Sequence, residues 1–155
     1  SEYFFSHLMD YYSKNSNWKK ATIMVNKAIK ADSTNMKAWI AKSTILINLG
    51  DYENSFLISQ SILDKDSTLE DAWLNAGLAK YNQGVNMEHD IKNFKQKRKQ
   101  VLQYYKEALP YLEKYKSICP KNADKWAMPL YSIYLNLNMG KQFDEIDELM
   151  KKQKI

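Results

Sequence analysis

Large aromatic residues recur along this chain at a fixed step, and no other feature limits its fold as strongly. Phe5, Trp39 and Trp73 follow one another at a constant step of 34 in sequence number, and Trp126 follows Trp73 at a step of 53, which is 34 plus 19. Two more series repeat the steps of 34 and 53, one aromatic and one of small residues: Trp18, Tyr52 and Tyr105, and Ala21, Ser55 and Ala108. Units of this length, with an early aromatic and a later small residue, are typical of two-helix solenoid repeats. The sequence therefore predicts an all-α solenoid of about four helical hairpins.

The composition agrees with a helical domain that has a hydrophobic core. The 155 residues are 45% hydrophobic and 26% charged, and only four glycines and three prolines occur, which argues against a fold with many turns. Cys119 is the single cysteine, so an intrachain disulfide and a cysteine-rich metal site are excluded. No apolar run approaches the roughly 18 residues of a membrane-spanning helix. Because the chain begins with Ser1 and not Met, a periplasmic or extracytoplasmic location stays as open as a cytoplasmic one.

We divide the chain into four repeats, each with two helices and a short turn, within a single domain over residues 1–155. Turn signals support this division. Gly50 offers a left-handed helix end and Asp51 an N-cap, and Thr68 is expected to cap a helix that begins near Glu70. The predicted repeats comprise residues 2–35, 36–69, 70–122 and 123–155.

Residues at matching places in the repeats form a family pattern. The matches are Phe5, Leu8, Tyr12, Ala21 and Ala28 in the first repeat, Trp39, Gly50 and Tyr52 in the second, Trp73, Gly77, Gly84, Tyr105, Ala108, Leu112 and Pro120 in the third, and Trp126 in the fourth. Phe143 comes about one turn late, which predicts a longer first helix before a polar closing helix. The pattern resembles the tetratricopeptide repeat (TPR), and in particular bacterial TPR proteins of uncharacterised role. The resemblance implies a right-handed α-α solenoid in which Trp39, Trp73 and Trp126 are largely buried and Gly77 permits close helix packing.

The third repeat contains 19 extra residues between Gly84 and Tyr105, and their pattern predicts helix. A mostly apolar stripe with spacings of 3 and 4 runs through them into the second helix of the repeat: Ile91, Phe94, Arg98, Val101, Tyr105, Ala108, Leu112 and Tyr115. We therefore predict an extended hairpin, with one helix over about residues 92–118 facing a first helix that reaches about residue 88. Pro110 predicts a bend in this helix and not a stop. Pro129 lies inside a predicted helix of the fourth repeat in the same way.

The insertion is also basic. Five cations against two carboxylates give it a charge of +3, out of +5 for the chain: Lys92, Lys95, Lys97, Arg98 and Lys99 against Glu88 and Asp90. Two interpretations stay open, a solvated helix face and an electrostatic contact of residues 92–99 with nucleic acid or anionic membrane. Because lysines outnumber the single arginine, we expect no specific nucleic-acid binding.

The sequence offers little material for catalysis. His7, His89 and Cys119 are the only residues of their types, and no glycine-rich phosphate loop occurs. Glu88, His89 and Asp90 are adjacent, but neighbours on a helix point in different directions and do not converge on one metal ion. We therefore predict no catalytic residues, no metal site and no cofactor, and we expect a protein that is not an enzyme.

The resemblance further implies that the first helices line a concave groove. The residues that it assigns to this partner groove are Thr44, Asn48, Asn75, Leu78, Tyr81, Asn82, Met128, Tyr131 and Tyr134. Tyr81 and Tyr131 are the expected anchors, because a tyrosine buries apolar area and keeps a polar tip. The places where some family members hold a partner's terminal carboxylate carry Ser6, Asp10 and Ala41, or Ile40, Thr44 and Asn75, so that clamp is not predicted.

These features predict a protein-protein interaction scaffold that binds a peptide or protein partner in the groove. The extended hairpin is a second surface, suited to docking or self-association. Two alternatives stay open: an electrostatic binder that uses residues 92–99, and an accessory repeat region of a larger protein.

Overall fold

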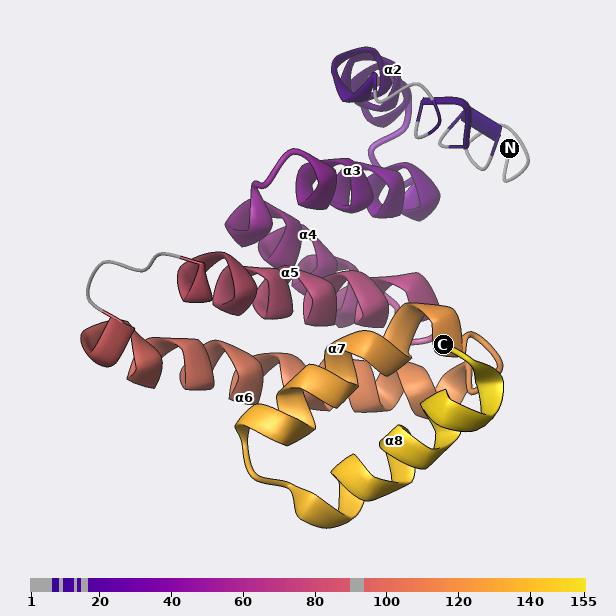
Figure 1. Cartoon of the computed structure of the whole chain (residues 1–155). Helices are drawn as coiled ribbons and strands as arrows, with labels where there is room; N and C mark the ends of the chain where they lie inside the picture. The colour runs from indigo at the N-terminus through magenta and orange to yellow at the C-terminus, as the bar shows by residue number, and fades with distance from the viewer. Residues whose placement is uncertain (1–6, 9, 13, 15–16, 90–93) are drawn as a thin grey trace. The chain divides into compact units, whose positions relative to one another are not determined.

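The structure of the protein is a computed structural model that describes residues 7–8, 10–12, 14, 17–89 and 94–155. Throughout these residues the regular elements are α-helices and no strand occurs, which confirms the all-α prediction (Figure 1). The helices are α2 (Trp18–Ala31), α3 (Met36–Asn48), α4 (Tyr52–Lys65), α5 (Glu70–Glu88), α6 (Phe94–Ile118), α7 (Ala123–Asn136) and α8 (Gly140–Gln153). The predictions that involve Phe5, Ser6, Asp90, Ile91 and Lys92 lie outside the described residues.

The helix boundaries repeat with the same step as the aromatic residues. The first residues of α2 and α4 differ by 34 in sequence number, as do those of α3 and α5, and the first residues of α5 and α7 differ by 53. α7 has 14 residues where α3 has 13, so the first helix of the last repeat is longer by one residue and not by a turn. That single residue shifts α8 and accounts for part of the late position of Phe143.

The chain forms two compact units, residues 1–75 and residues 76–155, and the division falls inside α5. In the first unit α2 packs on α3 and α3 packs on α4. Its core combines the small residues of the repeat pattern with branched side chains: Ala21, Val25, Ala38, Ala41 and Ile45 are buried, and Tyr12 and Trp18 pack against them. The prediction of one domain over the whole chain stays a prediction.

Short polar turns end and begin the helices of the first unit. Gly50 has a φ of 82°, as expected for a left-handed helix end, and the Asp51 carboxylate accepts a hydrogen bond from the Asn54 amide N–H at 3.3 Å. The prediction for Thr68 was wrong, because its hydroxyl donates to Asp66 Oδ1 and does not cap α5. This bond closes a local turn, which is the main alternative to capping that threonine offers.

The same turn occurs twice, and it positions two of the tryptophans. In Asp32-Ser33-Thr34 the threonine hydroxyl and amide donate to the Asp32 carboxylate at 2.6 and 2.9 Å, as Thr68 does to Asp66. Each turn then accepts an indole N–H through its serine carbonyl, from Trp39 to Ser33 at 3.0 Å and from Trp73 to Ser67 at 2.9 Å. Trp39 and Trp73 are partly buried, whereas Trp126 is buried as predicted.

In the second unit α5 and α6 run antiparallel (Figure 1), and glycines allow their close approach. A Cβ added at Gly77 would lie 2.6 Å from Leu112 Cγ, and one added at Gly84 would lie 2.6 Å from the Tyr105 ring. The predicted stripe of α6 is buried from Val101 onwards, at Val101, Tyr105, Ala108, Leu112 and Tyr115. α6 continues through Pro110 and α7 through Pro129, so neither proline stops its helix.

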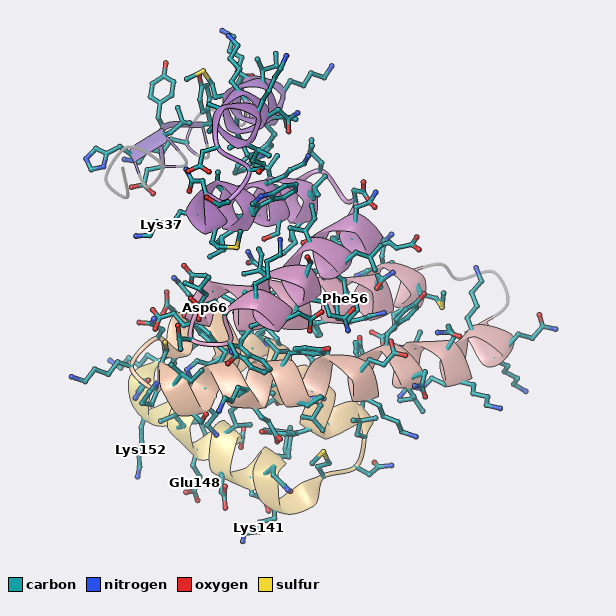
Figure 2. All side chains as sticks on the ribbon, turned by 180° about the vertical axis from the view of Figure 1, so that it is seen from behind. Lys37, Phe56, Asp66, Lys141, Glu148 and Lys152 are labelled. Atoms are coloured by element: carbon teal, nitrogen blue, oxygen red, sulfur yellow. The ribbon has the colours of Figure 1, made fainter. Side chains whose placement is uncertain are left out.

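α7 packs on α6 and on α8. Trp126, Leu130 and Ile133 of α7 and Ile146 of α8 are buried in this unit. The opposite side of α8 is charged, and Figure 2 shows Lys141, Glu148 and Lys152 projecting outward from it. A helix with one apolar and one charged side agrees with the predicted polar closing helix.

Candidate functional site

Exposed apolar side chains gather on one face of α7. Met128 is 52% exposed and Leu135 is 53% exposed, although both lie in a regular helix with a well-buried opposite face. Tyr131 lies between them at spacings of three and four residues, so the three side chains share one face of the helix. We call Met128, Tyr131 and Leu135 the α7 strip.

Aromatic contacts border the α7 strip on both sides. Toward α8, the Tyr131 ring packs against Phe143 with ring centroids 4.9 Å apart. Toward α5, the Tyr81 hydroxyl donates to Ser132 Oγ at 3.2 Å, and its ring stacks on Tyr105 of α6 at 5.6 Å. Tyr81 is thus a support that holds α5, α6 and α7 together, with part of its surface exposed. The strip lies on packed helices and not on a loop, which favours a pre-formed binding surface.

The other groove residues predicted in the second unit differ in their exposure to solvent. Leu78 and Asn82 of α5 are partly exposed, whereas Tyr134 is 3% exposed. The Tyr134 hydroxyl donates to Glu113 Oε1 at 2.9 Å, and burial together with this carboxylate raises the pKa of the phenol. Tyr134 therefore belongs to the contact between α6 and α7, and its assignment to the groove is corrected.

Asn75 in the first unit is also a structural residue. It is 4% exposed, and its amide Nδ2 donates to Ser43 Oγ at 2.7 Å and to Thr44 Oγ1 at 3.0 Å. Thr44 is partly buried through this contact, while Asn48 is exposed and its Nδ2 donates to the Thr44 carbonyl at 2.9 Å. Asn75 thus ties α5 to α3, and its side chain is not presented to a partner. A patch that joins these residues to Tyr81 and Tyr131 of the second unit stays a prediction.

A polar network closes the C-terminal end of α7. The Arg98 guanidinium donates to Asn136 Oδ1 at 2.8 Å and to Glu88 Oε1 at 3.1 Å, so it links α6 to the ends of α7 and α5. Burial and the nearby Glu88 carboxylate raise the pKa of the Tyr105 phenol. Glu88 therefore offsets the charge of Arg98, and Arg98 has a structural role that its place in the basic run did not indicate.

Two lysines of the described basic run are more available to solvent. Lys95 and Lys99 are exposed on α6, and Lys92 lies outside the described residues. The run thus contains both a partly buried structural cation and solvent-facing ones. Its use as a nucleic-acid or membrane contact, and self-association through the hairpin, both stay predictions.

Leu135 is the site residue that sequence reasoning missed. The signal was present, because Met128, Tyr131 and Leu135 follow the 3-and-4 spacing of one helix face. Assigning the groove by repeat position placed Tyr134 on the surface instead, one residue and thus about 100° away around the helix.

The first unit contains a small pocket between α3 and α4. Its volume is about 230 Å³, and it is lined by Met36, Trp39, Ile58, Ser61, Ile62 and Lys65. Ligand pockets usually have volumes of about 300–1,000 Å³, so the volume is small for an organic cofactor.

Comparison with protein-family models and with curated proteins finds no match to this chain. Within the described residues, no three His, Cys, Asp or Glu side chains are grouped so that they could hold a metal ion. Over the same residues, no helix has the length and apolarity needed to cross a membrane.

Proposed function

We propose that this protein is a non-enzymatic interaction module of the TPR type, in which about four helical hairpins form a right-handed solenoid. Helix boundaries that repeat at steps of 34 and 53 in sequence number support this assignment. The recurring Asp-Ser-Thr turn supports it further, because each copy accepts the indole N–H of the tryptophan that follows. Repetition of both the helix boundaries and the hydrogen bonds of the turns is typical of solenoids.

The partner in this proposal is a peptide or helix that binds along the α7 strip. The observation that carries the proposal is the exposure of Met128 and Leu135 on either side of Tyr131. Covering such a side chain fully contributes roughly 1.5–3 kcal/mol relative to full exposure, so half-exposed residues contribute about half of that each. Spacings of three and four match the way in which a helix or short peptide places apolar anchors in a groove.

Selection from a phage-displayed random peptide library tests this function. Peptides enriched on the native protein should lose most of their binding to the double variant Met128→Gln and Leu135→Gln. The matched control is the pair Ile23→Gln and Leu57→Gln, which alters residues that are 57% and 53% exposed in the first unit. Circular dichroism should show that both pairs fold.

Two results would count against the proposal. One is a set of peptides that bind both double variants equally well, and the other is the absence of any enriched peptide. Binding of an RNA or DNA oligonucleotide that survives physiological salt would instead favour the electrostatic alternative.

A further inference from the structure

We propose that the pocket between α3 and α4 binds a small aromatic carboxylate, with the aromatic ring inside and the carboxylate at Lys65. The two helices lie side by side in the first unit (Figure 1). All the lining residues belong to this unit, so the pocket is a different site from the α7 strip and does not depend on it. The pocket adds a small-molecule ligand to the peptide partner of the strip.

The pocket has an apolar floor and a polar mouth. Ile62 is 2% exposed and forms the floor, while the other apolar lining residues are partly buried. Ser61 and Lys65 are exposed and stand four residues apart on α4, so they are neighbours on one face of the helix. A ligand that fills the pocket therefore meets apolar side chains on the inside and a hydroxyl and an ammonium group at its outer end.

The volume fits one aromatic ring with a small substituent. It is about 230 Å³, and an engineered protein cavity of about 150 Å³ with an apolar lining binds benzene. In proportion, the pocket holds about nine non-hydrogen atoms, which corresponds to a benzene ring with a carboxylate. A phenylalanine at the end of a peptide has more atoms than this in its last residue alone, so a free aromatic acid fits the volume better.

The aromatic wall of the pocket is held in place by the turn that precedes α3. The Trp39 indole N–H donates to the Ser33 carbonyl at 3.0 Å, and the hydrogen bonds of Thr34 to Asp32 fix this turn. The Lys42 ammonium lies 5.5 Å from the centre of the same indole ring. Because the indole N–H is already satisfied, Trp39 presents apolar surface to the pocket, which suits an aromatic ring.

The charge at the mouth favours an anion. Lys65 forms no salt bridge with any residue that the structure describes. Of its two acidic neighbours in sequence, Asp64 lies about 100° away around α4, and Asp66 already accepts hydrogen bonds from the Thr68 hydroxyl and amide. A carboxylate at the mouth can therefore pair with Lys65 and accept a hydrogen bond from the Ser61 hydroxyl, whereas a cation is repelled.

Three compounds of nearly the same size and shape separate the effect of the ring from that of the charge: anionic benzoate, neutral benzamide and cationic benzamidine. Their binding to the full chain is followed by NMR through the Trp39 indole N–H signal, which the variant Trp39→Phe assigns. We expect benzoate to bind with a dissociation constant of about 1 mM. It should bind about two- to fivefold more tightly than benzamide, because an exposed ion pair contributes little, and benzamidine should bind most weakly.

Two pairs of variants at exposed positions locate the binding. Ser61→Phe fills the mouth and should abolish the binding of benzoate and benzamide, whereas Gln60→Phe, one residue earlier on α4, should not. Lys65→Gln should remove the preference for benzoate over benzamide, whereas Lys19→Gln, at the start of α2, should leave it unchanged. Circular dichroism should show that all four variants fold.

Several results would overturn the proposal and leave the function of the α7 strip untouched. They are the absence of any shift in the Trp39 signal, benzoate binding that survives Ser61→Phe, equal affinities for benzoate and benzamide, and a preference that survives Lys65→Gln. Tighter binding of N-acetylphenylalanine than of benzoate would assign the pocket to a peptide terminus, and it would overturn the proposal of a free aromatic acid as well.

Discussion

The contact between Gly77 and Leu112 gives the sharpest test of the packing in the second unit. A Cβ at position 77 would lie 2.6 Å from Leu112 Cγ, 2.8 Å from Cδ2 and 3.2 Å from the Leu112 backbone nitrogen. Leu112 is fully buried, so its side chain has little room to turn away, and the backbone contact remains even if it does. The variant Gly77→Ala therefore forces α5 and α6 apart locally.

Two opposing effects set the magnitude. Overpacking of a core costs about 1–3 kcal/mol. Replacing glycine by alanine inside a helix stabilises it by about 1 kcal/mol. We therefore expect a net loss of about 0–2 kcal/mol in the free energy of unfolding, and a lower midpoint in urea followed by circular dichroism. Gly140→Ala is the control, because nothing lies within 4 Å of a Cβ at that position.

A double-mutant cycle isolates the contact itself. Leu112→Ala alone should cost about 2–5 kcal/mol through the cavity it creates. In the Gly77→Ala background the same change should cost less, because the added methyl group occupies part of that cavity, with a coupling of about 0.5–3 kcal/mol. Additive effects, or a Gly77→Ala midpoint at or above that of Gly140→Ala, would show that the two helices do not meet as described.

Three further predictions follow from the turns and the core. The hydrogen bonds from the Thr34 side chain and backbone lower the pKa of Asp32 below 3.8. The folded protein is therefore stabilised by these bonds above that pH and loses this stabilisation as the pH falls through the pKa of Asp32 in the folded state. In the variant Thr34→Ala, carboxyl NMR titration should show a raised pKa for Asp32 and an unchanged pKa for Asp66. Ser59→Ala should raise the unfolding midpoint by removing a buried hydroxyl without a partner, worth about 1 kcal/mol, and a lower midpoint would mean that the hydroxyl is satisfied. Asn138→Gly should stabilise the turn after α7 by up to about 1 kcal/mol, because Asn138 has a φ of 55°, and thermal unfolding would measure it.

The sequence predicted the helices well because their boundaries depend on local chemistry that recurs at the repeat step. Asp51 caps α4 and Gly50 closes α3 through interactions within a few residues, and both were visible in the sequence. Thr68 was misjudged because a threonine beside Asp66 has two local hydrogen-bond options of similar strength. The choice between them depends on the geometry of the turn and not on composition.

The candidate site was harder to predict because repeat position fixes a helix face only to within about one residue. At about 100° per residue, the step from Tyr134 to Leu135 is the difference between a buried phenol that contacts Glu113 and an exposed apolar side chain. Asn75 was assigned to the groove for a different reason. Its place on α5 suits a groove, but Ser43 and Thr44 on α3 supply hydrogen-bond partners that only the folded unit brings near.

Arg98 shows why a count of charges did not identify the role of the insertion. The sequence places it within an otherwise apolar stripe, between Phe94 and Val101, where an exposed cation would be out of place. In the structure Glu88 and Asn136 satisfy its guanidinium, so it fixes the end of α7 against the hairpin. Lys95 and Lys99, on either side of it in sequence, stay exposed. The position of Arg98 in the stripe was therefore a better guide to its role than its place in the basic run.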